Sequence, residues 1–214
     1  MTPEKSPFIR LATLNDLDMV TDLHLASFSP DDHIPVMFGP RYVKAMYRWQ
    51  IRSPEAYTLV AEEDGKIVGL LGMCDKPYTK PMFMACFGEF ILSLLKKPTL
   101  LLQGKLWQRL SRDSKLSGKG EMIARNPGIA QMTIGAVDKD HRGSGIFPVL
   151  VDATKSFSKA RGSWAIRAGI YKTNMSSRRV FIKGGWIETP ELETSDTVFY
   201  VTYLDPGFQK ELGL

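Results

Sequence analysis

The stretch DKDHRGSGIFPVL, residues 138–150, has the residue types of an anion-binding loop. Arg142 supplies a permanent positive charge, and Gly143 and Gly145 let the backbone approach a ligand closely. A helix is expected to follow, and its first N–H groups lack intrahelical acceptors while its dipole makes that end positive. Pro148 suits the first helical turn because it has no N–H to leave unsatisfied. The pattern predicts a cradle for phosphate groups, with a ligand-free glycine turn as the plain alternative.

Two common nucleotide-binding motifs do not fit this loop. A P-loop ends in Gly-Lys-Ser or Gly-Lys-Thr, and the sequence has no such ending. The dinucleotide fingerprint G-x-G-x-x-G lacks its third glycine here.

The composition favours an anionic ligand and argues against several other functions. The 214 residues carry a formal net charge of +5, which is too mild a basic excess to indicate a nucleic-acid partner. Cys74 and Cys86 are the only cysteines and do not form a metal-binding pattern, so we expect no metal and a reduced, cytoplasmic protein. The N-terminus has no apolar segment typical of a secretory signal. The apolar run 82–95 is shorter than the roughly 20 residues that a spanning helix needs, so we expect no transmembrane segment.

Strands and helices alternate around the loop. A short strand at 8–12 comes first, followed by two helical stretches that a breaker-rich loop at 29–40 separates. The turn residues Asp64-Gly65 then predict a hairpin. The second half is predicted to contain strand 129–137, a helix ending at Gly162, strand 164–171, a helix from Asn174 to Gly184-Gly185, and strand 196–204. This order predicts an α/β fold with a mixed central sheet and flanking helices, in one domain over 1–214.

Residues 77–128 interrupt this order with a basic segment. Eight lysines and arginines follow the apolar run: Lys96, Lys97, Lys105, Arg109, Arg112, Lys115, Lys119 and Arg125. We expect a helical insertion with breaks near Pro98 and after Asp113. Such an amphipathic segment packs on the core or on a second subunit, or lies on an anionic membrane surface.

Two motifs together resemble the GCN5-related N-acetyltransferase (GNAT) superfamily. The first is a strand ending in Val, then Arg/Gln-x-x-Gly-x-Gly/Ala; Val137, Arg142 and Gly145 match it, and Phe147 replaces the small last residue. The second is an Asn followed by a small residue, an aromatic residue and a Gly-aromatic pair, here Asn174, Ser177, Phe181 and Gly185-Trp186. The resemblance runs from Phe8 to Leu204, apart from the insertion.

The resemblance implies a mostly antiparallel sheet with a V-shaped splay, and acetyl-CoA as the co-substrate. It implies that the end of the central strand binds the pantetheine arm and that the loop holds the pyrophosphate. The residues implied to bind CoA are Gly135, Ala136, Val137, Arg142, Gly143, Ser144, Gly145, Ile146, Phe147 and Asn174. The Phe147 ring must then point away from the pyrophosphate.

The resemblance also implies direct attack of an amine on the thioester, with the N–H of Val137 stabilising the oxyanion. A tyrosine seven positions after the Asn commonly protonates the thiolate, but Phe181 stands there. The remaining proton donors are Tyr171, Ser176, Ser177 or solvent.

No residue stands out as the base that deprotonates the amine. One position that relatives use for a base is Gly169 in this sequence. His33, next to Asp31 and Asp32 in the expected acceptor loop, and Glu62 on a neighbouring strand are the candidates for contacting the acceptor.

Three functions follow from these features. The first is an N-acyltransferase that acts on a small-molecule or protein amine, with the insertion as a candidate contact surface for a homodimer. The second is a non-catalytic CoA-binding module, which the missing tyrosine suggests. The third is an acyltransferase held at a membrane surface by its insertion.

Overall fold

The computed structural model describes residues 7–30, 33–102, 119–205 and 207. Seven strands form one sheet in the order β1-β2-β3-β4-β5-β7-β6. Their bounds are β1 Phe8–Leu11, β2 Ala56–Glu63, β3 Lys66–Cys74, β4 Ile129–Val137, β5 Ala165–Tyr171, β6 Ile187–Glu188 and β7 Thr197–Tyr203. Strands β4 and β5 pair in parallel and the other described neighbours pair antiparallel. The predicted mixed, mostly antiparallel sheet is therefore confirmed.

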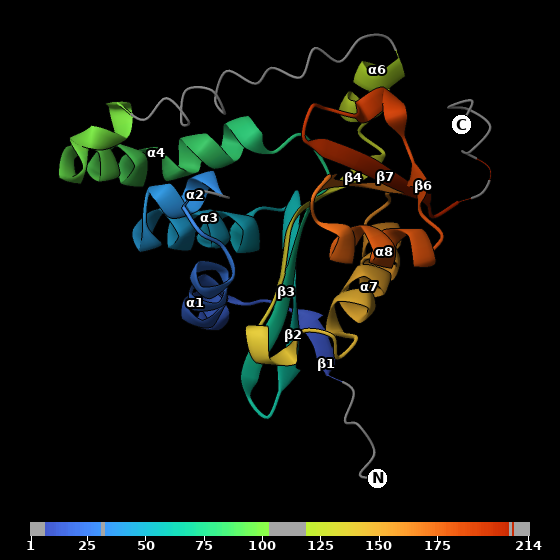
Figure 1. Cartoon of the computed structure of the whole chain (residues 1–214), viewed down its shortest axis with the longest axis horizontal. Coiled ribbons are helices and arrows are strands. Elements are labelled where there is room, and N and C mark those ends of the chain that lie inside the picture. The colour runs from blue at the N-terminus through green and yellow to red at the C-terminus, as the bar shows by residue number, and fades with distance from the viewer. Residues whose placement is uncertain (1–6, 31–32, 103–118, 206, 208–214) are drawn as a thin grey trace.

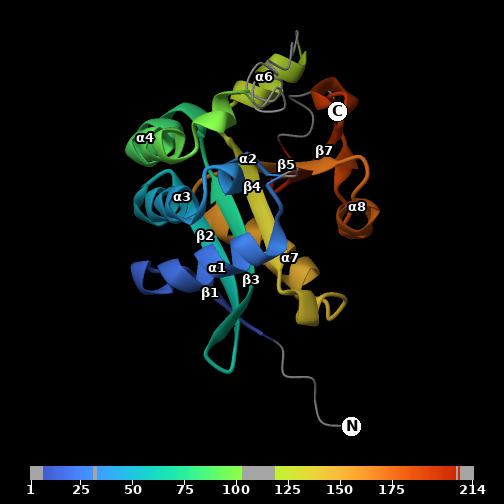
Figure 2. The same ribbon diagram turned by 60° about the vertical axis from the view of Figure 1, so that its left-hand side comes forward.

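Helices cover both faces of this sheet (Figures 1 and 2). One face carries α1 (Leu17–Ser27), α2 (Ile34–Met37), α3 (Pro40–Arg52) and, outside α3, α4 (Thr79–Lys96). The other face carries α7 (Ile146–Ala160) and α8 (Met175–Lys183).

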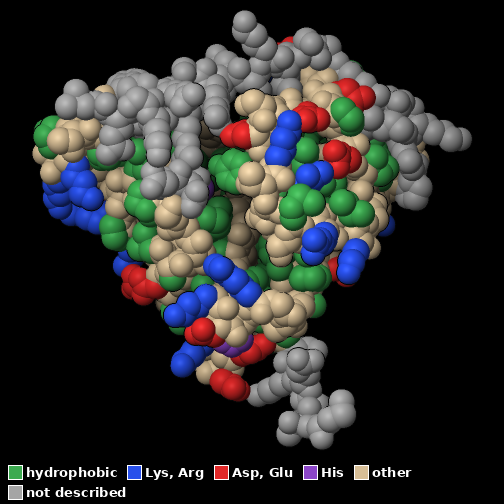
Figure 3. Space-filling view, in the orientation of Figure 1, with side chains coloured by type: hydrophobic (Ala, Val, Ile, Leu, Met, Phe, Trp, Pro, Cys, Tyr) green, Lys and Arg blue, Asp and Glu red, His purple; other side chains and the backbone are tan. Residues whose placement is uncertain are grey.

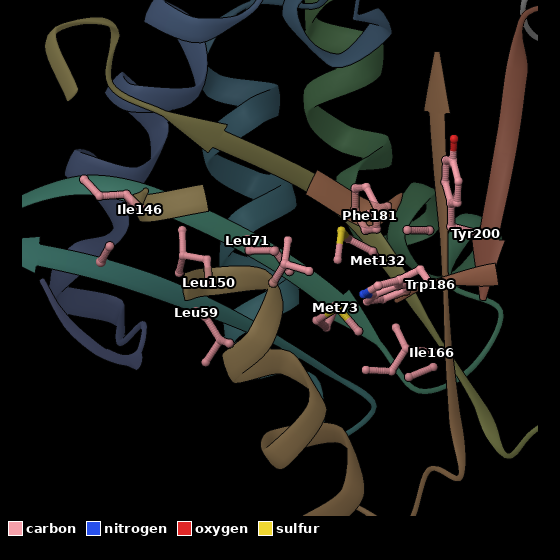
Figure 4. Packing of buried hydrophobic residues seen from close by; sticks show 14 of the residues in the cluster. Leu59, Leu71, Met73, Met132, Ile146, Leu150, Ile166, Phe181, Trp186 and Tyr200 are labelled. Atoms are coloured by element: carbon pink, nitrogen blue, oxygen red, sulfur yellow. The ribbon is translucent and has the colours of Figure 1, made fainter. Parts of the chain in front are cut away.

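A hydrophobic cluster fills the space on each face of the sheet. On the α1 and α3 side, Val20, Val43, Tyr47 and Leu70 are fully buried. On the other side, the cluster under α7 and α8 includes Leu59, Leu71, Met73, Leu150, Ile166, Phe181 and Tyr200 (Figure 4). Burial of this apolar area on both faces fixes the sheet between its helices.

Short-range signals placed several element ends correctly. Asp64 and Gly65 have φ of 48° and 77°, the left-handed pair that an Asp-Gly hairpin turn requires. The Oδ1 atom of Asn174 accepts the N–H of Ser177 at 3.1 Å and so caps α8. The short helix α2 lies in a stretch that its many breaker residues predicted to be a loop, so this prediction was wrong. The two-residue strand β6 gave no periodic signal and was missed.

The insertion is helical in the part that the structure describes. Helix α4 ends before a 3-10 turn at Pro98–Leu102, which confirms the break near Pro98, and α6 (Lys119–Arg125) follows. The expected break after Asp113 lies outside the described residues. Within the described ranges, no helix is both long and apolar enough to cross a bilayer.

Candidate functional site

The parallel strands β4 and β5 separate halfway along β4. Their pairing runs from Ile129↔Ala165 to Met132↔Ala168 and then stops, whereas β4 stays paired with β3 as far as Val137. Thr133 is the extra residue of a bulge in β4 at this point. Since a bulge bends its strand, it accounts for the departure of β4 from β5. The expected V-shaped splay is present, and a groove runs between the two halves of the molecule (Figure 3).

The end of β4 presents unpaired backbone groups to this split. The N–H of Asp138 donates to the carbonyl of Val68 at 2.9 Å. Antiparallel alternation therefore turns the backbone of Ala136 toward β3 and that of Gly135 and Val137 toward the open side. Such groups can pair with an extended ligand as a neighbouring strand would.

The loop after β4 has the backbone conformation that its glycines allow. Gly143 and Gly145 have φ of 84° and 88°, the left-handed region that disfavours residues with a Cβ. Gly145 caps α7, so the N–H groups of Ile146 and Phe147 lie in its first turn without intrahelical acceptors. The exposed Arg142 donates from Nε to the carbonyl of Val137 at 3.4 Å. A cationic side chain thus lies between the strand end and the positive end of α7.

Ser144 does not direct its hydroxyl toward a ligand in this conformation. Its Oγ donates to the carbonyl of His141 at 2.6 Å, which holds the turn. The contribution that Ser144 offers to an anion is its backbone N–H.

The ring of Phe147 points beneath β4 and into the core. A Cβ on Gly135 would lie 2.7 Å from its Cε2 atom, so the ring occupies the space that this glycine leaves. Phe147 also meets Phe181 edge to face at 6.2 Å between ring centroids. Phe147, although larger than the Gly or Ala expected at this position, therefore leaves the N-terminus of α7 open.

Phe181 stands at the position where the resemblance implies a tyrosine, and its side chain is fully buried in an aromatic cluster. Its ring stacks on Tyr200 at 5.6 Å and meets Trp186 edge to face at 4.9 Å (Figure 4). The hydroxyl of Tyr200 accepts Nε of Arg178 at 3.1 Å. The position of Phe181 thus supplies no proton donor.

The other predicted donors lie near the open end of the split. Tyr171 ends β5 and is 47% exposed, and the half-buried Ser177 lies in the first turn of α8. Gly169 has no room for a basic side chain, because a Cβ there would lie 2.8 Å from the Phe199 ring. This contact explains the glycine at the position where a base was considered.

His33 belongs to a hydrogen-bonded chain that the sequence did not reveal. Its Nδ1 lies 3.1 Å from Nε2 of His24, whose Nδ1 lies 2.9 Å from the hydroxyl of Tyr47. His24 is fully buried on α1, and burial lowers its pKa to about 3, with a smaller effect from His33. The only available signal was a histidine on the apolar face of the first helix. Asp31 and Asp32 lie outside the described residues.

Glu62 lies on β2, apart from the split between β4 and β5. Its carboxylate accepts Nε of Arg10 at 2.7 Å, and the same guanidinium binds Asp16. The hydrogen bond from Arg10 is the main reason why the pKa of Asp16 falls to about 2. Glu62 is therefore engaged in an ion-pair network at the N-terminal edge of the sheet. In the part of the chain with described coordinates, no three acidic, His or Cys residues gather as a metal site.

Comparison with known proteins assigns the fold. No family model and no curated protein matches the chain. An N-acetyltransferase from Staphylococcus aureus Mu50 is similar in structure, with a TM-score of 0.57, 16% identity, and coverage of 94% of this chain and 100% of that one. So is yncA, a putative acetyltransferase from Salmonella typhimurium with its cofactor acetyl-CoA, with a TM-score of 0.57, 16% identity and coverage of 94% and 96%.

A third similar structure contains bound coenzyme A. The PaiA N-acetyltransferase from Thermoplasma acidophilum, in complex with coenzyme A, has a TM-score of 0.59, 10% identity, and coverage of 92% of this chain and 99% of that one. The chain has the fold of the GNAT N-acetyltransferases.

Proposed function

We propose that the chain is an acyl-CoA-dependent N-acyltransferase that uses acetyl-CoA. The main observation behind this proposal is that two features lie side by side at the open end of the split. The backbone of Gly135 and the N–H of Val137 face away from β3 and lie beside a helix N-terminus that Gly143 and Gly145 open to an anion. The CoA and acetyl-CoA complexes among the similar structures support the same donor.

Each part of the site has a role in this proposal. The N–H groups from Gly143 to Phe147 bind the pyrophosphate, and Arg142 adds positive charge. Gly135 and Val137 hold the pantetheine arm, so that the thioester lies in the split. The N–H of Val137 stabilises the oxyanion that forms when the acceptor amine attacks. The attacking nitrogen loses a proton to solvent, and Tyr171 or solvent protonates the departing thiolate, which leaves readily near neutral pH.

Ligand-dependent melting tests the binding step. Coenzyme A at millimolar concentration should raise the melting temperature, because a ligand that binds only the folded state stabilises it. An unchanged melting temperature would contradict the proposal.

Thiol release with a panel of primary amines tests the transfer step. The fully buried Phe181 ring favours a second function, a CoA-binding module without catalysis. Amine-dependent release of free thiol supports the enzyme. Strong stabilisation by CoA without release from any amine supports the module.

The outer face of α4 supports the membrane alternative. Met84, Phe87, Ile91 and Leu95 recur along one side of the helix and are between 39% and 75% exposed. Lys96 and Lys97 follow them at an exposed helix end. An apolar stripe beside lysines suits an anionic lipid surface. Co-sedimentation with anionic vesicles at low salt tests this; failure to bind would rule out the membrane role and leave the acyltransferase proposal intact.

A further inference from the structure

Arg167 places a guanidinium at the apex of the split between β4 and β5. It pairs with Gln131, one residue before the last parallel pair, Met132↔Ala168. Ile166 and Ala168 belong to the cluster under α7 and α8, so the side chain of Arg167 projects to the opposite face. That face carries α3 and α4 over β2 to β4 and α6 beside β5, and Nη2 of Arg167 donates there to Oε1 of Gln131 at 2.5 Å.

This arginine lacks a counter-ion in the described part of the chain. It is half-buried, its Nε is buried with no hydrogen-bond partner, and no carboxylate of a described residue forms an ion pair with it. Burial lowers its pKa, although Tyr78 nearby opposes the effect. Burial raises the pKa of Tyr78 to about 12, so that hydroxyl stays neutral and does not balance the charge.

A partly desolvated cation without a counter-ion favours the binding of an anion from solution. Burying a charge costs free energy unless it is paired, and most of the donors of Arg167 are not used by Gln131. The other half-buried arginines of the described residues differ: Arg10 contacts Asp16 and Glu62, and Arg178 contacts Glu188. Arg167 is thus set apart by its lack of an acidic partner.

We propose that Arg167 binds a carboxylate of the acceptor, so that the acceptor is an amine that also carries a carboxylate, such as an amino acid. This inference rests on the proposed acyltransferase function, which brings the thioester to the same split. The planar guanidinium suits a carboxylate, and it fixes the acceptor where its amine reaches the thioester. Arg167 is a specificity-determining residue in this scheme.

Paired acceptors test the proposal by turnover. We expect L-amino acids to be acetylated with a kcat/KM at least about tenfold above that of their C-terminal amides, because a hydrogen bond to a charged group discriminates by this order. Arg167→Gln should remove the preference while CoA still raises the melting temperature, and Arg167→Lys should keep part of it. Arg178→Gln is the matched control and should leave the acid-to-amide ratio unchanged.

A binding measurement keeps the test independent of turnover and of the variants. With CoA present, N-acetyl amino acids should raise the melting temperature of the wild-type chain more than N-acetyl amino acid amides do. Equal responses to acids and amides in both assays, or an intact preference in Arg167→Gln, would overturn the assignment. Loss of the CoA-induced shift in the wild type would instead contradict the acyltransferase proposal.

Discussion

At the scale of single residues, glycines at the two ends of α7 allow an effect on ligand binding to be distinguished from an effect on stability. Gly145 and Gly162 have φ of 88° and 86° at the start and just after the end of this helix, with open space at both Cβ positions. Replacing either by valine forces a β-branched residue into the left-handed region, at a cost of roughly 1–2 kcal/mol. We expect similar losses of stability from both substitutions.

Only one of these two variants should affect the ligand. Gly145→Val should also abolish the rise in melting temperature that CoA causes, whereas Gly162→Val should keep it. Thermal melts with and without CoA measure both effects. A full CoA response in Gly145→Val would show that the pyrophosphate binds elsewhere.

A second prediction at residue scale concerns the group that protonates the thiolate. Tyr171→Phe should lower kcat by about tenfold or more if its hydroxyl protonates the thiolate, since general acids contribute this much or more. CoA binding should not change, because the hydroxyl is not part of the cradle. Ser177→Ala is the comparison at a second predicted donor. Steady-state thiol release compares them, and an unchanged kcat in Tyr171→Phe would mean that its hydroxyl is not the proton donor.

His24 makes stability depend on pH through its burial. Its pKa is about 3 in the folded chain and about 6.5 when unfolded, so below pH 6.5 the unfolded state binds more protons. The His24 contribution is therefore complete above pH 6.5 and is lost as the pH falls toward 3, at up to about 1.4 kcal/mol per pH unit. His33 and Tyr47 contact its ring nitrogens, and Phe28 packs on the ring.

Denaturant unfolding between pH 7 and pH 4.5 measures this dependence. We expect a shallower loss of unfolding free energy in His24→Gln than in the wild type. An unaltered slope in His24→Gln would mean that His24 is not the source.

At the scale of elements, the fit of α7 to β4 depends on one close contact. A methyl group on Gly135 would overlap the Phe147 ring, so Gly135→Ala should cost about 1–3 kcal/mol. The same substitution should cost clearly less in a Phe147→Ala background, because the overlap is gone. A double-mutant cycle of unfolding free energies gives the coupling, and additive effects would contradict the packing described here.

Elements governed by short-range chemistry were predictable from the sequence. The Asp64-Gly65 turn, the Asn174 cap and the glycines around α7 depend on the backbone needs of one or two residues. Hence the strand–loop–helix of the cradle and most element ends agree with the prediction.

Contacts between distant segments were not predictable in this way. The His24–His33–Tyr47 chain, the Arg10 network around Glu62 and the ring of Phe147 under Gly135 depend on how helices pack on the sheet. Spacing along the chain carries no information about such pairs. The same holds for Arg167, which looks like an ordinary strand residue until β4 and β5 are seen to part beside it.

At the scale of the whole molecule, the split sheet brings the two proposed binding sites together. Its α7 side offers backbone N–H groups and a positive helix end, while its α3 side holds Arg167 and its polar neighbours. In the proposed function, the acyl donor and the acceptor approach the apex from opposite faces. The insertion adds α4 as a further layer outside α3 (Figure 1).

A crystal structure of the chain with coenzyme A tests the central claim most directly. The account predicts the pyrophosphate on the N–H groups of residues 143–147, the pantetheine arm along Gly135 and Val137, and the sulfur atom in the split near Met132. Coenzyme A bound at another surface, or no bound coenzyme A at saturating concentration, would contradict it.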